Sequence, residues 1–163
     1  MDDRISDLLE IVREEIAVYG NLLEHTRQKT ALLVQGRVEA ILASNRAEEG
    51  FTIRLRALEM KLMSLCQDLG RSFRIPREEI TLAKLAKSLE QPLALELQTQ
   101  TALFQNLVKQ VKSVSQRNRK LLQKSIQHSR DLLGIISNAT GSYQQTGLFE
   151  AMPSIQPTFS QRA

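Results

Sequence analysis

Histidine, cysteine and paired carboxylates are the residues of this chain that could support acid–base, nucleophilic or metal chemistry. The 163 residues include two histidines, His25 and His128, and one cysteine. A phosphorelay bundle would use one exposed histidine with a lysine and small residues nearby, and the HTRQK segment that begins at His25 is similar to that arrangement. A lone histidine among polar residues is more often an ordinary exposed helix residue. We therefore predict that neither histidine is catalytic, with the phosphorelay bundle as an alternative.

Cysteine and acidic pairs offer no metal or nucleophilic site either. Cys66 alone cannot form a zinc site, and a free cysteine is more commonly packed in a core than used as a nucleophile. His128 with Asp131, or Asp3 with Asp7, could share a helix face, but neither pair brings the third and fourth ligands that a metal needs. The chain has neither a phosphate-binding glycine loop nor a Gly-x-Ser-x-Gly turn. We predict no enzymatic activity, no metal and no cofactor.

The overall composition favours an all-α protein. Hydrophobic residues make up 42% and aromatic residues 4%, there is no Trp, and seven Gly and four Pro are the only strong turn formers. The abundant Leu, Gln, Glu, Lys, Arg and Ala residues favour helices. The start, MDDRISDLLE, is acidic where a secretory signal would be basic, and no apolar run approaches the roughly 20 residues that span a bilayer. We expect a cytoplasmic protein that does not insert into a membrane.

Charge is distributed unevenly along the chain. Residues 1–15 contain six acids against two arginines, which suits the positive end of a helix dipole. Residues 97–130 contain seven basic residues and no acid, so their net +7 exceeds the +4 of the whole chain. An acidic partner should approach this second stretch first. Because no aromatic residue alternates with these charges for base stacking, nucleic acid is an unlikely partner, and a basic coiled-coil scaffold that binds nucleic acid or acidic protein is kept as an alternative.

Apolar and small residues recur at alternating steps of four and three, which is typical of helices that pack lengthwise. One such series runs from Ile5 to Leu33, a second from Ile41 to Leu69, and the longest from Leu97 to Ile136. Pro76 and Pro92 bracket a short apolar-periodic piece between the last two series. The predicted helices span residues 3–34, 38–70, 81–89 and 93–138.

These helices predict one domain and a tail. Gln35 and Gly36 should form a tight turn that pairs the first two helices as an antiparallel hairpin. Thr81 should cap the connector helix, and the last helix should stop between Asn138 and Gly141, where Asn and Gly can adopt the left-handed conformation. We predict an all-α, elongated antiparallel hairpin or bundle of three long helices plus one short connector helix, with a single domain over residues 1–141 and a flexible tail over residues 142–163.

The last helix has more apolar surface than one narrow stripe. Its four-three series contains polar residues in mid-run, and of these Asn118 predicts a buried polar residue that fixes the register of packing. Further apolar residues flank the series toward Ile136. Because a hairpin cannot cover so wide a face, we expect this end to bind an amphipathic helix of a partner.

The segment from Arg117 to Gly147, RNRKLLQKSIQHSRDLLGIISNATGSYQQTG, resembles the C-terminal part of the FlgN-type flagellar export chaperones. Their last helix has an Asn, a Leu pair and a Ser–hydrophobic step, often followed by Tyr and Gly; here these are Asn118, Leu121, Leu122, Ser125, Ile126, Tyr143 and Gly147. The LLVQGRVEAI break and the TLAKLAKSL element are similar to the family as well. The resemblance covers most of the chain.

The resemblance implies a cytoplasmic, non-enzymatic chaperone. Its cargo would be the hook–filament junction proteins, whose disordered C-terminal helices it would bind with its own C-terminal part before delivery to export-gate components, with no small-molecule substrate. Carried over to this sequence, the partner-binding residues are Leu121, Leu122, Ile126, Leu132, Leu133, Ile135, Ile136 and Tyr143. Two roles of Tyr143 are kept as alternatives: docking on the export gate, and a hydrophobic contact that caps the end of the helix. Self-association of free chains through the exposed apolar stripe is open too.

Overall fold

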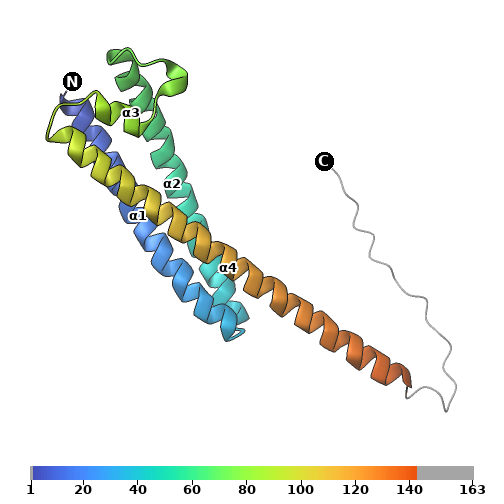
Figure 1. Ribbon diagram of the computed structural model, residues 1–163. Coiled ribbons are helices and arrows are strands. Elements are labelled where there is room, and N and C mark those ends of the chain that lie inside the picture. Colours follow the sequence, from blue (N-terminus) through green and yellow to red (C-terminus); the bar gives the residue numbers. More distant parts are fainter. Residues whose placement is uncertain (1, 143–163) are drawn as a thin grey trace. The chain divides into compact units, whose positions relative to one another are not determined.

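A computed structural model of the protein describes the backbone of residues 2–142 and the side chains of residues 3–137 (Figure 1). The described part contains four α-helices, one 3₁₀-helix and no strand, which confirms the predicted all-α class. It divides into two compact units, one up to Gln123 and one from Lys124 onward, and the boundary lies within the last helix. The predicted flexible tail lies outside the described residues.

The first two helices form an antiparallel hairpin. Helix α1 spans Asp2–Val34 and α2 spans Val38–Ser72, and the two pack side by side (Figure 1). The turn between them contains Gly36 at a φ of +65°, a left-handed conformation that glycine adopts without a steric penalty. The turn therefore lies where the Gln35–Gly36 pair predicts it, and the helix ends are within two residues of the predicted 3–34 and 38–70.

A short connector joins the hairpin to the last helix. It contains the 3₁₀-helix η1, Arg77–Glu79, and the helix α3, Leu82–Lys87, which is shorter than the predicted 81–89. The hydroxyl of Thr81 accepts a hydrogen bond of 3.1 Å from the backbone N–H of Lys84, so Thr81 is the N-cap as predicted. Gln91–Pro92 is a cis peptide bond at the start of the last helix.

The last helix, α4, spans Leu93–Ser142 and is 50 residues long. It continues through the segment from Asn138 to Gly141, so the prediction that it stops at residue 138 is wrong. A single Asn or Gly inside a helix costs only about 1 kcal/mol relative to Ala, and the backbone hydrogen bonds of a continuous long helix can outweigh this cost.

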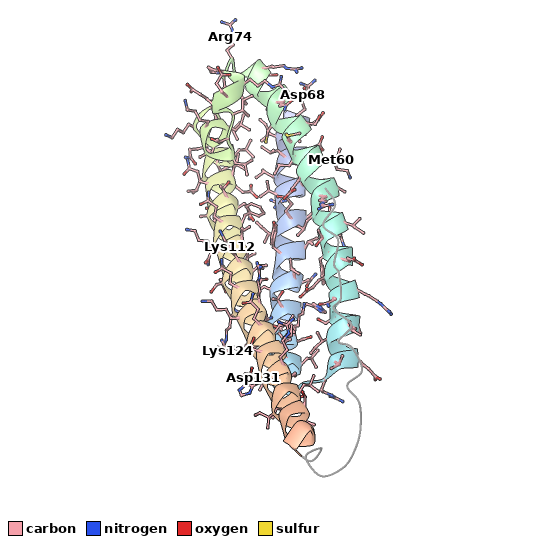
Figure 2. All side chains as sticks on the ribbon, turned by 90° about the vertical axis from the view of Figure 1, so that its right-hand side faces the viewer. Met60, Asp68, Arg74, Lys112, Lys124 and Asp131 are labelled. Atoms are coloured by element: carbon pink, nitrogen blue, oxygen red, sulfur yellow. The ribbon has the colours of Figure 1, made fainter. Side chains whose placement is uncertain are left out.

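The main hydrophobic core lies at the end of the hairpin that carries the connector. It combines residues of α1, α2, α3 and the start of α4, and its fully buried members are Leu8, Val12, Leu69, Leu85, Ala86 and Leu97. A second, smaller cluster on α1 and α2 consists of Val18, Leu55 and Leu58. Large apolar side chains also remain on the outer face of α2, and among them Met60, labelled in Figure 2, is 70% exposed.

Candidate functional site

The part of α4 up to Gln123 packs against α1. Near its start, Glu96 forms an exposed ion pair with Arg13. Eight residues further along the helix, the rings of Phe104 and Tyr19 meet edge to face with centroids 5.3 Å apart. These contacts pair residues that are 83 and 85 positions apart in the chain, so they fix α4 against α1 in one register.

Asn118 is the last buried residue of α4 within the described chain. It is 5% exposed, and its Nδ2 donates a hydrogen bond of 2.8 Å to the carbonyl oxygen of Thr26. Its Oδ1 accepts one of 2.7 Å from the Thr30 hydroxyl. The amide thus has a partner at both ends, which is what a polar residue needs in order to be buried without a large penalty. The prediction of a buried polar residue at this position is confirmed.

Beyond Asn118 the side chains of α4 are no longer buried. None from Arg119 to Ser137 is buried, and Leu121 alone among the apolar ones is partly covered. The exposed fraction rises from 44% at Leu122 to 66% at Leu133, and the other exposed apolar residues are Ile126, Leu132, Ile135 and Ile136. The predicted four-three series from Leu97 to Ile136 therefore packs within the chain only over its first half.

Helical spacing arranges most of these exposed residues on one face. Leu122, Ile126, Leu133 and Ile136 follow one another at steps of four, seven and three, which places them in a row along the helix; we call them the α4 apolar stripe. Ser129 occupies the gap in the row, and its hydroxyl donates a hydrogen bond of 3.0 Å to the carbonyl oxygen of Ser125. Of the remaining predicted partner-binding residues on the helix, Leu121 and Leu132 lie beside this row, whereas Ile135 lies farther around the helix, on nearly the opposite face. Tyr143 lies outside the described residues.

The seven basic side chains of residues 97–130 are all exposed. They are Lys109, Lys112, Arg117, Arg119, Lys120, Lys124 and Arg130, of which Lys112 and Lys124 are labelled in Figure 2. No aromatic residue occurs between residues 105 and 142, so this surface lacks the stacking platforms of a single-strand binding site. It is a solvated cationic surface suited to attracting an acidic partner.

A groove of about 250 Å³ lies beside Asn118, between α1, α2 and α4 of the first unit. Its wall contains an ion pair between Lys29 and Glu48, whose nitrogen and oxygen are 2.6 Å apart and whose side chains are mostly buried. Leu122, the first residue of the α4 apolar stripe, also lines the groove. The groove therefore offers both apolar surface and a charged pair at the point where the packing of α4 on α1 ends.

His25 is half-buried between α1 and α2, so the prediction that it is an exposed helix residue is wrong. Its Nε2 lies 3.1 Å from the carbonyl oxygen of Ser44 and 2.9 Å from the Ser44 hydroxyl, and its ring lies 5.8 Å from that of Phe51. Ser44, which belongs to α2, is itself buried, because α1 and α2 face each other at this point. His128 is exposed, as predicted.

Cys66 is partly buried and packs against the main hydrophobic core, which confirms the prediction of a packed thiol. Burial, and secondarily the nearby charge of Glu15, raise the pKa of the thiol to about 11. A thiol with so high a pKa holds its proton at neutral pH and is a poor nucleophile.

Glu15 is a functional candidate that the sequence pattern does not reveal. It belongs to the acidic first turns of α1, yet it is 1% exposed and its Oε1 is buried with no hydrogen-bond partner among the described residues. Burial raises the pKa of its carboxyl group to about 7, and the charge of Glu59 contributes in the same direction. The available signal is a second four-three series on α1, Leu8, Val12 and Glu15, beside the predicted one.

None of the helices within the described residues is long and apolar enough to cross a membrane. Among the same residues, no group of three or more His, Cys, Asp or Glu side chains is placed to hold a metal ion.

Comparison with known proteins gives one result that covers nearly the whole chain. A family model described as FlgN protein matches residues 1–149, which include the hairpin, the connector and all of α4. No curated protein and no solved structure matches the chain.

Proposed function

The chain belongs to the FlgN family, a family of flagellar export chaperones, and from this membership we propose that it binds the C-terminal amphipathic helices of the hook–filament junction proteins. By covering these helices it prevents their premature assembly, and it then delivers them to the export gate from the cytoplasm. FlgN proteins are chaperones and not enzymes, which agrees with the high pKa of the Cys66 thiol. The observation that carries the proposal is the α4 apolar stripe.

The α4 apolar stripe has the dimensions of a helix-binding surface. Its four residues recur over four helical turns, as the anchors of a helix-in-groove complex do, and Ile126 and Leu133 are 45% and 66% exposed. Covering the exposed part of each would contribute on the order of 1 kcal/mol, so the stripe with its neighbour Leu132 offers several kcal/mol to an amphipathic partner. This is enough for reversible binding, which a chaperone that must release its cargo requires.

The test is a calorimetric titration with a synthetic peptide of a junction protein's C-terminal helix. We expect saturable binding with a negative heat-capacity change, because apolar surface is buried. An Ile126→Asp, Leu133→Asp variant should lose this binding. The matched control is Ile53→Asp, Met60→Asp, which changes two residues of α2 that are also seven positions apart and are each 70% exposed.

Two outcomes contradict the proposal. One is the absence of binding by a wild-type protein whose circular dichroism shows it to be folded. The other is an equal loss of affinity in the α2 control, which would mean that any added acid disturbs the complex and that the α4 apolar stripe has no special part in it.

Electrostatic binding through the exposed basic residues of α4 is the competing explanation for any complex. Raising the salt concentration from about 0.1 M to about 0.5 M shortens the screening length by roughly half, and it would weaken a complex held by those charges many-fold. A complex held by the α4 apolar stripe should keep its affinity within a few-fold. A phosphorelay through His25 has less support, because the Nε2 of this histidine already contacts the hydroxyl and carbonyl oxygens of Ser44.

A further inference from the structure

An open cavity of about 500 Å³ lies between α1, α2, the connector and the start of α4, all within the first unit. Its walls are mainly apolar and include Leu62, Met63, Cys66, Ile80, Leu82 and Phe104. This volume is in the range of small-ligand sites, which combine apolar walls with a few polar groups. The cavity shares no residue with the α4 apolar stripe, so a function for it is separate from cargo binding.

Glu15 supplies a polar group to this cavity. Its side chain is almost completely buried, and Oε1 has no hydrogen-bond partner among the described residues. A buried carboxyl oxygen without a partner destabilises the fold, because it has lost its water and gained nothing in exchange. In native proteins the missing partner of such a group is a water, an ion or a ligand.

The charges around the cavity select the kind of ligand. Glu59 on α2 lines the cavity and adds a second negative charge close to Glu15. The one basic residue in the wall, Arg77, is exposed, and no ion pair of the described residues joins it to either acid. Two acids without a paired cation repel an anion and attract a cation.

Phe104 favours the same ligand. It lines the cavity, and its ring also makes the edge-to-face contact with Tyr19. An aromatic face attracts an ammonium or guanidinium group placed over it. The surrounding Leu and Ile side chains can cover the aliphatic stem that such a group carries in lysine, arginine and alkyl amines.

From these observations we propose that the cavity binds an organic cation on an apolar stem, with the cationic head at Glu15, Glu59 and Phe104 and the stem against Leu62 and Leu82. The cation is the side chain of a lysine or arginine in a partner protein, or a free alkyl amine. Both sources present the same chemistry to the site.

The test uses n-butylammonium as the free amine and the blocked peptide acetyl-Ala-Ala-Lys-Ala-Ala-amide as the source of a lysine side chain. Both are titrated into the full chain while the methyl resonance of Met63, which lines the cavity, is followed by NMR. We expect saturable shifts with n-butylammonium and none with butanoate. Binding should also slow the alkylation of Cys66, the only cysteine of the chain, because this residue forms part of the same wall.

Two variants locate the cation. Glu15→Gln keeps the shape of the side chain but removes its charge, and it should weaken n-butylammonium binding at least tenfold; Glu59→Gln, at an exposed position, should weaken it several-fold. Glu10→Gln is the matched control, because Glu10 lies on the same helix, is exposed and is not part of the cavity. Circular dichroism of each variant shows whether it is folded.

The pH dependence provides an independent readout. The titratable and charged groups around Glu15 are Tyr19 on α1, Glu59 and Cys66 on α2, and Arg77 on η1, while α3 and α4 contribute apolar Leu82 and Phe104. Because Glu15 becomes fully charged only above neutral pH, the affinity for n-butylammonium should rise between pH 6 and pH 8 in the wild-type protein and stay level in Glu15→Gln.

The outcomes distinguish the two sources of the cation and also test the proposal itself. Binding of both probes assigns the site to a protein side chain as well as to free amines, whereas binding of n-butylammonium alone restricts it to free amines. Absence of saturable shifts with n-butylammonium in the folded wild-type protein overturns the proposal. Equal affinities of wild type and Glu15→Gln for n-butylammonium also overturn it. If Glu15→Gln does not fold, the proposal is overturned by a Glu59→Gln variant that binds n-butylammonium as tightly as wild type.

Discussion

The side-chain amide of Asn118 on α4 donates a hydrogen bond of 2.8 Å to the backbone carbonyl oxygen of Thr26 on α1, across 92 positions of sequence. This contact joins a side chain to main chain, so it requires one particular alignment of the two helices. A shift of α4 by one turn would leave this buried amide without its partner, and such a shift is therefore disfavoured.

Replacing this amide should weaken the fold. We expect Asn118→Ala to lower the free energy of unfolding by about 1–3 kcal/mol, because the two hydrogen bonds of the amide, to the carbonyl oxygen of Thr26 and from the hydroxyl of Thr30, are lost. The matched control is Asn106→Ala on an exposed position of α4, which should change stability by less than about 0.5 kcal/mol. Urea denaturation of both variants measures the difference. Equal effects would mean that the amide of Asn118 contributes nothing specific.

Glu15 should make stability depend on pH. Its carboxyl pKa is raised from 4.5 to about 7 in the folded chain, so between these values the folded protein retains a proton that the unfolded protein has released. Stability from this group is therefore lost as pH rises, by at most about 3 kcal/mol between pH 4.5 and pH 8.

The comparison that isolates this effect is wild type against Glu15→Gln. The difference in unfolding free energy should favour the variant increasingly as pH rises from about 4.5 to about 7 and should level off above that, since glutamine has no proton to lose. A difference that stays constant from pH 5 to pH 8 would show that Glu15 titrates normally. Urea denaturation at several pH values provides the data.

Two glycines of α2 should respond oppositely to alanine. A Cβ on Gly70 would lie 2.5 Å from Cδ1 and 2.7 Å from Cγ1 of Ile80, whereas a Cβ on Gly50 meets nothing within 4 Å. We expect Gly70→Ala to cost about 1–3 kcal/mol through overpacking. Gly50→Ala should stabilise the chain by about 0.5–1 kcal/mol, because alanine is the better helix former.

A double-mutant cycle checks the cause at Gly70. Combining Gly70→Ala with Ile80→Ala removes the clash, so the pair should cost clearly less than the sum of the single changes. Additive costs would mean that the backbone of the connector, and not the Ile80 side chain, limits the space.

The sequence predicted the helices, the hairpin turn and the Thr81 cap, because each depends on a few neighbouring residues. Apolar periodicity, the Gln35–Gly36 pair and the threonine before an apolar run are local signals. The end of α4 was predicted wrongly because Asn and Gly only permit a helix to stop and do not force it to. A proline would have interrupted the backbone hydrogen bonds, and the segment from Asn138 to Gly141 contains none.

The environments of Glu15 and His25 could not be predicted in the same way. Both lie outside the predicted four-three series of α1, which describes a helix that is covered along one narrow stripe. In the structure α1 is covered by α2 on one side and by α4 on another, so its buried face is wider. Which of its polar residues becomes buried depends on the angle between three helices, and that angle is not encoded in any local pattern.

Tyr143 provides a prediction about delivery that is separate from cargo capture. It follows α4 directly in the chain and lies beyond the α4 apolar stripe. If it contacts the export gate, Tyr143→Ala should leave affinity for the junction-protein peptide within twofold while it reduces binding to the isolated cytoplasmic part of the gate. If it only packs on the helix end, Tyr143→Ala should instead lower the helix content and leave gate binding intact. Circular dichroism and a pull-down with the gate fragment distinguish the two.

The absence of buried side chains between Arg119 and Ser137 affects the energetics of capture as well as its specificity. A helical segment without tertiary burial opens locally far more often than a core helix, so its backbone amides should exchange with deuterium much faster than those near Leu97. A partner helix that covers the α4 apolar stripe would suppress this opening. Cargo binding would then order the chaperone's own helix as well as the cargo helix. The ordering would carry a large unfavourable binding entropy, which the burial of apolar surface offsets. Slowed deuterium exchange of these backbone amides in the complex would report it.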